Sequence, residues 1–476
     1  MLHGVDTRYR PRSCLYHLAL TCKIFRDLAI PKLYEVCNLN KSPVALLRSL
    51  IKSPANAACI KKVILSLDGT PAADRIFSAE DAALFNSVLK RKVKPHTVLL
   101  LPKAGSYSTR LKAGDLQSAI AAAFATILVA VARNVQVVVS SMGPRLAEFC
   151  PGAFPRIECI AVHHWSEQGG FGLHKVEGLL RGTVLSPNAQ RFVGFAMRII
   201  PEAFRYSSIR ELLLSHCMLE AKDFRLLPRV FPNLEILGYE GGGYRDNSLK
   251  EPTPRELWCE IVKYKSTLKI LRLQYDERRY KDERLSEEDL MGSLACMEVL
   301  HTIQIHARYL YRNYTENEPI DDGSLGITTD EQEYYRQSIA RDRIRQAEEA
   351  KRTDESSNDD EGIQFDGYAQ EVKECVETIE EPNRKRDQDD NTRLASFLPK
   401  SIEKLTIIDF ASNEMQDVMQ VLEVSKASFP HMTEINLPGI DNDGEDRDWI
   451  VEDCEYFGIK CSFEATPFNT YGGWVI

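Results

Sequence analysis

The sequence lacks the cysteine arrangements that mark a metal site or a disulfide framework. Its twelve cysteines are spread through 476 residues, and no two of them form a Cys-x-x-Cys pair. Structural zinc needs four sulfur or nitrogen ligands close together, and disulfide frameworks belong to short secreted chains. We therefore expect free thiols, no bound metal, and a protein of the cytoplasm or the nucleus.

Long apolar runs and a basic field are also missing. The longest apolar run, residues 119–132, is interrupted only by Thr126 and predicts a buried helix, because a bilayer span needs roughly 20 residues. The apolar stretch at residues 15–20 is too short for a signal peptide. The net charge is −9, whereas proteins that bind nucleic acid through its phosphates carry clustered Lys and Arg. We expect neither a membrane nor a nucleic-acid partner.

Catalytic motifs are absent as well. The sequence contains no Gly-x-Ser-x-Gly and no His-Glu-x-x-His, and the glycines at residues 169–172 lack the spacing of a phosphate-binding loop. His163 directly follows an expected strand, so a surface position is its simplest interpretation. We therefore expect no catalytic residues, no cofactor and no enzyme activity. An enzyme with an unrecognised α/β fold is the alternative, and it would need a cleft with perturbed ionisable groups.

One short pattern recurs along the chain: an apolar residue, two variable residues, an apolar residue, one variable residue and an apolar residue. Its last two apolar positions lie two apart, so they share one face of a strand. Amphipathic stretches with helix-start signals lie between copies, as at Ser78 to Asp81 and before Arg255. The nine copies begin at Ile60, Ile157, Phe192, Ile209, Leu234, Leu268, Leu300, Ile402 and Met432.

This alternation resembles the leucine-rich repeats in an irregular form. It predicts an α/β fold in which a curved sheet carries helices on its convex side, with repeats over 41–307 and the final repeats and a C-terminal cap over 394–476. We expect helices over 290–297, 415–424 and 446–457. A doubly wound sheet is the alternative, but its strands would be apolar on both faces. In this sequence only residues 135–139 and 98–101 have the apolar runs expected of strands buried on both faces.

The pattern stops between the two groups of repeats. Residues 308–393 begin with a possible helix and continue as an acidic stretch. Its last 43 residues, 351–393, hold 14 acidic, 7 basic and only 8 apolar side chains. Such a composition cannot bury enough surface to fold, so we expect a disordered insertion. It is either a tolerated loop expansion or a docking segment phosphorylated at Ser356 and Ser357.

The N-terminal segment carries a second resemblance. Residues 15–34 read LYHLALTCKIFRDLAIPKLY, and we expect Pro31 to end the helix that precedes it. The segment resembles the second half of an F-box in the form common in fungal proteins. Residues 1–13 contain no counterpart of the first helix of that family. Residues 1–40 therefore match the F-box only in part. The matching residues are Leu15, Leu18, Leu20, Lys23, Phe25, Arg26, Leu28, Ala29, Pro31, Leu33 and Tyr34.

The two resemblances together imply a function. An F-box would bind a Skp-type adaptor of a cullin complex through an apolar face made by Leu18, Phe25, Leu28 and Leu33. The repeats would hold an unknown target protein on their variable strand positions, so the chain would be the substrate-recognition receptor of an SCF-type ubiquitin ligase. The first candidates for target binding are Arg272, Gln274 and His306. The alternative is a protein-binding scaffold with no ubiquitin role, whose N-terminal segment only caps the repeats.

Overall fold

The computed structural model of the chain divides into two compact units, which are Met1–Arg312 with Asn391–Ile476, and Asn313–Asp390. The second unit lies outside the described residues, and so do the expected acidic insertion and both of its serines. The structure describes residues 10–39, 43–65, 78–92, 124, 127–128, 130–140, 156–162, 188–195, 206–217, 219–241, 252–274, 290–310, 393–410, 415–438, 440 and 445–464.

Among the described residues of the first unit, twelve strands form one parallel sheet whose spatial order follows the sequence from β1 to β12. The predicted α/β class is confirmed. A doubly wound sheet reverses its strand order at a switch point, and this order contains no reversal, so that alternative is wrong. The strands are β1 (Val36–Asn38), β2 (Lys62–Leu65), β3 (Val137–Ser140), β4 (Cys159–Val162), β5 (Arg191–Phe195), β6 (Glu211–Cys217), β7 (Ile236–Gly241), β8 (Ile270–Gln274), β9 (Thr302–His306), β10 (Lys404–Ile408), β11 (Glu434–Asn436) and β12 (Lys460–Ser462).

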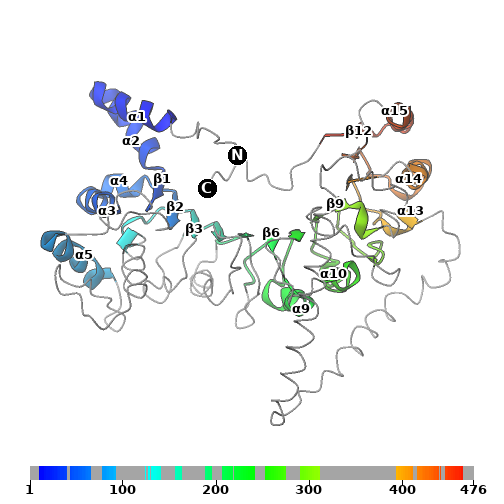
Figure 1. Cartoon of the computed structure of the whole chain (residues 1–476), viewed down its shortest axis with the longest axis horizontal. Coiled ribbons are helices and arrows are strands. Elements are labelled where there is room, and N and C mark those ends of the chain that lie inside the picture. The colour runs from blue at the N-terminus through cyan, green and yellow to red at the C-terminus, as the bar shows by residue number, and fades with distance from the viewer. Residues whose placement is uncertain are drawn as a thin grey trace, which may run out of the picture. The chain divides into compact units, whose positions relative to one another are not determined.

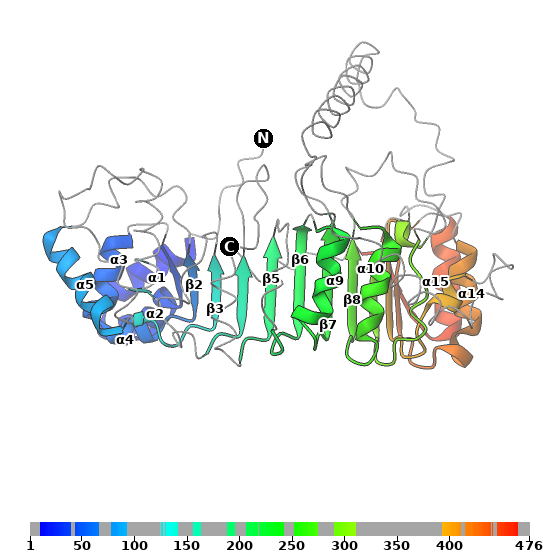
Figure 2. The same ribbon diagram turned by 90° about the horizontal axis from the view of Figure 1, so that it is seen from below.

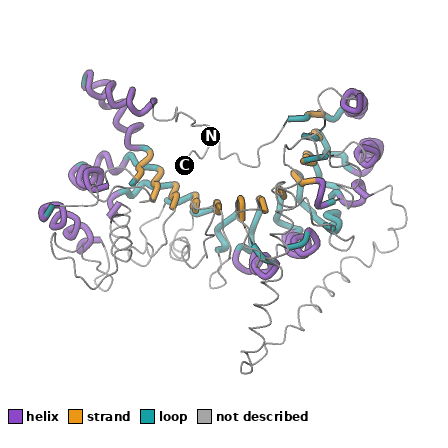
Figure 3. Tube along the Cα trace, viewed as in Figure 1, coloured by secondary structure: helices purple, strands orange, loops and turns teal. Residues whose placement is uncertain are grey.

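The helices from α3 onward lie along one side of this sheet (Figures 1 and 3). Figure 2 shows the strands running in one direction, with α9 and α10 packed against them. None of the described helices is both long enough and apolar enough to span a membrane. The helices are α1 (Arg10–Thr21), α2 (Lys23–Tyr34), α3 (Pro43–Lys52), α4 (Pro54–Ala58), α5 (Ala79–Lys92), α9 (Ala221–Val230), α10 (Pro254–Ile261), α13 (Arg393–Phe397), α14 (Met415–Ser428) and α15 (Glu445–Phe457), with 3-10 turns η5 (Val262–Tyr264) and η7 (Ala307–Tyr309).

The register of the sheet places one buried side chain of each strand in line with the next. We call this line the apolar column. From β1 to β11 its side chains are at most 4% exposed, so it forms the centre of the core between sheet and helices. Its members are Cys37, Val63, Val138, Ile160, Phe192, Leu212, Leu237, Leu271, Ile303, Leu405, Ile435 and, in β12, the half-buried Cys461.

Eight of the nine predicted pattern copies supply their middle residue to the apolar column. The copy predicted to begin at Phe192 is wrong by three residues, because Phe192 pairs in register with Leu212 and is itself a middle residue. The true copy begins at Ala189, which is fully buried, and ends at Gly194. Small residues at its first and last positions hid it. The copy in β3 was missed for a similar reason, since it ends at Ser140.

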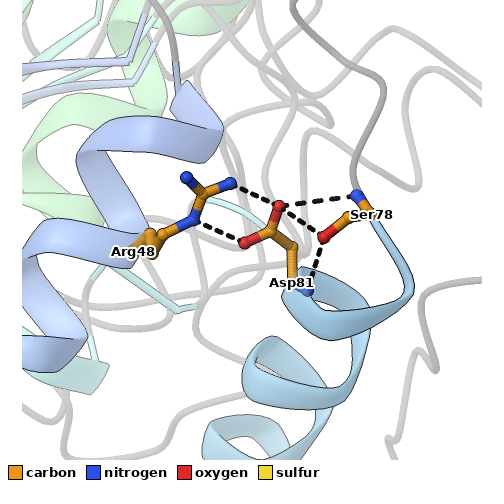
Figure 4. A network of polar contacts seen from close by, with 3 residues as sticks. All are labelled: Arg48, Ser78 and Asp81. Carbon is orange, nitrogen blue, oxygen red and sulfur yellow. Dashed lines mark hydrogen bonds and ion pairs between the residues drawn. The ribbon is translucent and has the colours of Figure 1, made fainter.

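The start of α5 shows how local sequence and packing agree (Figure 4). The Ser78 hydroxyl accepts a hydrogen bond from the backbone N–H of Asp81 at 3.1 Å, and the Asp81 carboxylate accepts one from the Ser78 backbone at 3.4 Å. This is the predicted capping box. Arg48 of α3 donates two further hydrogen bonds to the same carboxylate, at 2.7 and 2.6 Å. These bonds hold the pKa of Asp81 below its usual value, against the effect of burial.

The expected helices at α10, α14 and α15 are confirmed, but the helix expected over 290–297 is wrong. The described residues there form turns, because their backbone groups bond to other segments: Met291 donates to the carbonyl of Tyr309 at 3.0 Å, and Leu294 to that of Phe397 at 2.8 Å. Gly292 also lies against the buried indole of Trp258, where a Cβ would approach ring atoms to 2.6 Å. Tertiary contacts therefore override the amphipathic pattern of this segment.

Candidate protein-binding surfaces

Helices α1 and α2 pack against each other and are separated by Cys22, whose backbone is extended; we call this pair the hairpin. The Thr21 hydroxyl donates to the Leu18 carbonyl at 2.8 Å and closes the end of α1. The prediction that Pro31 ends the second helix is wrong, because α2 continues through it to Tyr34. Proline in a helix removes one backbone donor, and here that loss falls in the last turn of α2.

The hairpin carries most of the exposed apolar surface in the described part of the chain. Of eight large hydrophobic side chains that are exposed there, six belong to α1 and α2. The predicted adaptor-binding residues Leu18, Phe25 and Leu28 are among them, with exposed fractions of 36%, 45% and 66%. The fourth, Leu33, is half-buried. We call the exposed set the hairpin face; it comprises Tyr16, Leu18, Leu20, Ile24, Phe25 and Leu28.

Sequence reasoning missed three members of the hairpin face, of which Tyr16 is 56% exposed. Leu20 is 67% exposed and Ile24 is 72% exposed. Leu20 matches the F-box pattern, but it was not assigned to the binding face, while Ile24 occupies a variable position of that pattern. Apolar identity alone does not separate such residues from core residues. The usable signal was the helical spacing, because Ile24 and Leu28 lie four residues apart on α2.

The other side of the hairpin is anchored to the sheet. Ala29 is 1% exposed, and the Tyr34 hydroxyl lies 3.3 Å from that of Ser49 on α3. Glu35, just after α2, lies 3.0 Å from the Lys32 amine and 3.6 Å from that of Lys61, at the start of β2. The hydrogen bond from Lys32 lowers the pKa of Glu35 more than burial raises it. These contacts tie the end of α2 to α3 and to the segment before β2.

An open cavity of about 290 Å³ lies beside this anchor. Its charged groups have partners within the lining: Glu35 pairs with Lys32 and Lys61, and the Arg156 guanidinium donates a hydrogen bond to the Asn134 side chain at 2.8 Å. Among the described residues no three metal-ligating side chains gather, here or elsewhere. The cavity is lined by Pro31, Lys32, Glu35, Ala58, Cys59, Lys61, Asn134, Gln136 and Arg156.

The second candidate surface is the sheet face opposite the apolar column. Residues that directly follow the column point to this face, and we call them the variable row. The row is apolar from β2 to β6, contains Gly238 in β7, and is polar from β8 onward. Its members are Asn38 in β1, then Ile64, Val139, Ala161, Val193, Leu213, Gly238, Arg272, Gln304, Thr406, Asn436 and Ser462.

The apolar half of the variable row corrects the sequence analysis. Ile64, Val139, Ala161 and Val193 are all at most 7% exposed and cluster with Cys159. Strands β2 to β5 are therefore buried on both faces, whereas the sequence suggested this only for 135–139 and for 98–101, which lies outside the described residues. The sequence did carry a signal for this burial, because the strands contain the short runs Val63-Ile64-Leu65, Ile160-Ala161-Val162 and Phe192-Val193-Gly194, in which no polar residue interrupts.

The predicted target-binding residues lie on two neighbouring strands in the polar half. Arg272 is half-buried in β8, between Gly238 and Gln304 in register. Its guanidinium makes no hydrogen bond or ion pair with any described residue. Gln274, two residues further, pairs in register with Glu240 and is also half-buried.

His306 differs from these two residues because it is only 3% exposed. Its Nδ1 accepts a hydrogen bond from the Arg308 backbone at 3.2 Å, and its Nε2 lies 3.5 Å from the Asp409 carboxylate. Burial lowers the pKa of His306 to about 4, although Asp409 opposes this shift. His306 is therefore neutral at pH 7 and offers little surface to a partner.

Comparison with known proteins adds no identification. No protein-family model matches the chain, and no curated protein matches it. Functional interpretation therefore depends on the hairpin face and the variable row.

Proposed function

We propose that this chain is a non-catalytic substrate-recognition receptor of an SCF-type, cullin-based ubiquitin ligase. The hairpin face would bind the Skp-type adaptor, and the first unit would be an irregular leucine-rich-repeat solenoid that holds a target protein. The receptor would supply proximity, since holding two reactants together removes much of the entropic barrier. The chemistry would belong to the ubiquitin-transferring enzyme.

The observation that carries the proposal is the exposure of the hairpin face. Leu20, Ile24 and Leu28 are 67%, 72% and 66% exposed. Several large apolar side chains exposed on one short segment often mark a surface that another protein covers. The same residues belong to the segment that resembles an F-box, so the exposure and the resemblance point to the same partner.

The strand arrangement supports the solenoid part of the proposal. Each strand pairs with the strands before and after it in sequence, as stacked repeats require. The apolar column advances by 20 residues from Phe192 to Leu212 and by 25 from Leu212 to Leu237, within the range of leucine-rich repeats. Other intervals are longer, such as 34 residues from Leu237 to Leu271, which makes the array irregular.

Co-expression with the adaptor followed by affinity capture tests the proposal. We expect stoichiometric capture by the full chain and at least about 30-fold weaker capture by Leu28→Asp, because loss of a buried anchor costs roughly 2 kcal/mol or more. Trp449→Asp on α15 is the matched control, since Trp449 is equally exposed at 67% but lies outside the hairpin. Equal capture of wild type and Leu28→Asp would refute the assignment of this face.

The alternative function is a protein-binding scaffold in which α1 and α2 only cap the repeats. The anchoring of Ala29 and the Tyr34 hydroxyl favours this possibility, since such contacts seal the edge of β1. A scaffold would show no adaptor in purified complexes. It would also lose stability when residues 10–34 are removed, which thermal unfolding would detect.

A further inference from the structure

The outer face of α15 carries a second exposed aromatic patch, far along the chain from the hairpin face. Trp449 and Tyr456 are 67% and 77% exposed. They are the two large exposed hydrophobic side chains of the described residues that lie outside α1 and α2. They are seven positions apart, which is close to two helical turns, so both lie on the same side of α15.

The packing face of α15 lies on the other side of the helix. Ile450 and Cys454 are fully buried, and they are four residues apart, as one helical stripe requires. The exposed aromatic residues therefore do not contribute to the core. Core packing therefore does not explain why Trp449 is on this surface, because its exposed ring is not buried against other side chains.

Three carboxylates lie beside the two aromatic residues on α15. Asp448, Glu452 and Glu455 are all exposed on the same side of α15. Their side chains form no hydrogen bond or ion pair with any described residue. By helical position, Glu452 lies between Trp449 and Tyr456, and the other two flank them. The result is an acidic, aromatic helix face.

One neighbouring contact shows what these rings accept. The amine of Lys426, on α14, lies 5.8 Å from the centre of the Tyr456 ring and 5.7 Å from that of Phe457. Such cation–π contacts are strongest over tryptophan, and no cation of a described residue lies over the Trp449 ring. Lys426 reaches only the Tyr456 end of the face.

We propose that this face of α15 binds a lysine- or arginine-rich segment of a partner protein. Basic side chains would stack on Trp449 and Tyr456 and would pair with Asp448, Glu452 and Glu455. An apolar partner would desolvate three carboxylates without compensation, which is unfavourable, and an acidic partner or a nucleic acid would be repelled. The site is separate from the hairpin face, so it does not depend on adaptor binding.

Tryptophan fluorescence of the full chain tests the proposal locally. The chain has four tryptophans, and the difference between wild type and Trp449→Phe isolates the emission of Trp449. A hexa-arginine peptide should protect this emission from acrylamide quenching, more strongly at low salt, whereas hexa-glutamate should not. Arginine bound at the acidic stretch 351–393 would not protect Trp449. Unchanged quenching of Trp449 at saturating hexa-arginine would overturn the proposal.

A charge variant sharpens the test. Glu452→Gln should weaken the affinity measured by this protection about threefold, as expected for one exposed ion pair. Glu423→Gln is the matched control, because Glu423 is also exposed, on α14, but has no exposed aromatic neighbour on that helix. Equal effects of the two variants would show that only the net charge matters and would also overturn the proposal.

Discussion

Leu271 and Arg272 are adjacent residues of β8 that test the orientation of the whole sheet. Leu271 is fully buried in the apolar column between Leu237 and Ile303, whereas Arg272 is half-buried on the opposite face. A Leu→Ala change in a core removes transfer free energy and leaves a cavity, at a cost of about 2–5 kcal/mol. We expect Leu271→Ala to lower the free energy of unfolding by about 3 kcal/mol.

The neighbouring substitution supplies the internal control. Arg272 has no hydrogen-bonded or charged partner among the described residues, so Arg272→Ala should change stability by less than about 0.5 kcal/mol. Urea unfolding followed by circular dichroism measures both variants, because the midpoint shifts in proportion to stability. A one-residue error in register would exchange the two faces. The reasoning would fail if Arg272→Ala destabilised the protein as much as Leu271→Ala does.

Two other substitutions have defined outcomes. Asp81→Asn should lower the free energy of unfolding at pH 7 by roughly 1 kcal/mol. Because the pKa of Asp81 is lower in the folded state, this difference from wild type should be complete above about pH 4 and should vanish as the pH falls through the folded pKa. A difference that stays constant down to pH 2 would contradict this reasoning. Gly292→Ala should cost about 1–3 kcal/mol, since its Cβ would collide with Trp258; thermal unfolding that matches wild type would argue against that close contact.

The strands were largely predictable because each copy of the pattern places two large apolar residues on one face. The pattern cannot be recognised where a small residue occupies one of its apolar positions, as Ala189 and Gly194 do in the copy that contains β5. Burial in this sheet depends on position rather than on side-chain size. A glycine can therefore lie at a buried position of a strand although the hydropathy of the sequence does not indicate burial there.

The candidate surfaces were less predictable, because they depend on contacts between distant segments. His306 looked like an exposed polar position, but it is buried, with its Nε2 3.5 Å from Asp409, a residue more than one hundred positions away in the chain. Ile24 looked like an ordinary helix residue, and only the packing of α2 leaves it 72% exposed. Sequence spacing identifies which residues share a face, but it does not say which faces become covered.

The pairing of β9 with β10 has a consequence for how this chain can change in length. The two strands stay in register over five residue pairs, from Thr302 with Lys404 to His306 with Ile408, although 97 residues separate His306 from Lys404. The entropy of closing a loop grows only with the logarithm of its length, so this connection costs roughly 1 kcal/mol more than the 27-residue link from Gln274 to Thr302. Related chains can therefore gain or lose most of this connection while keeping the same sheet.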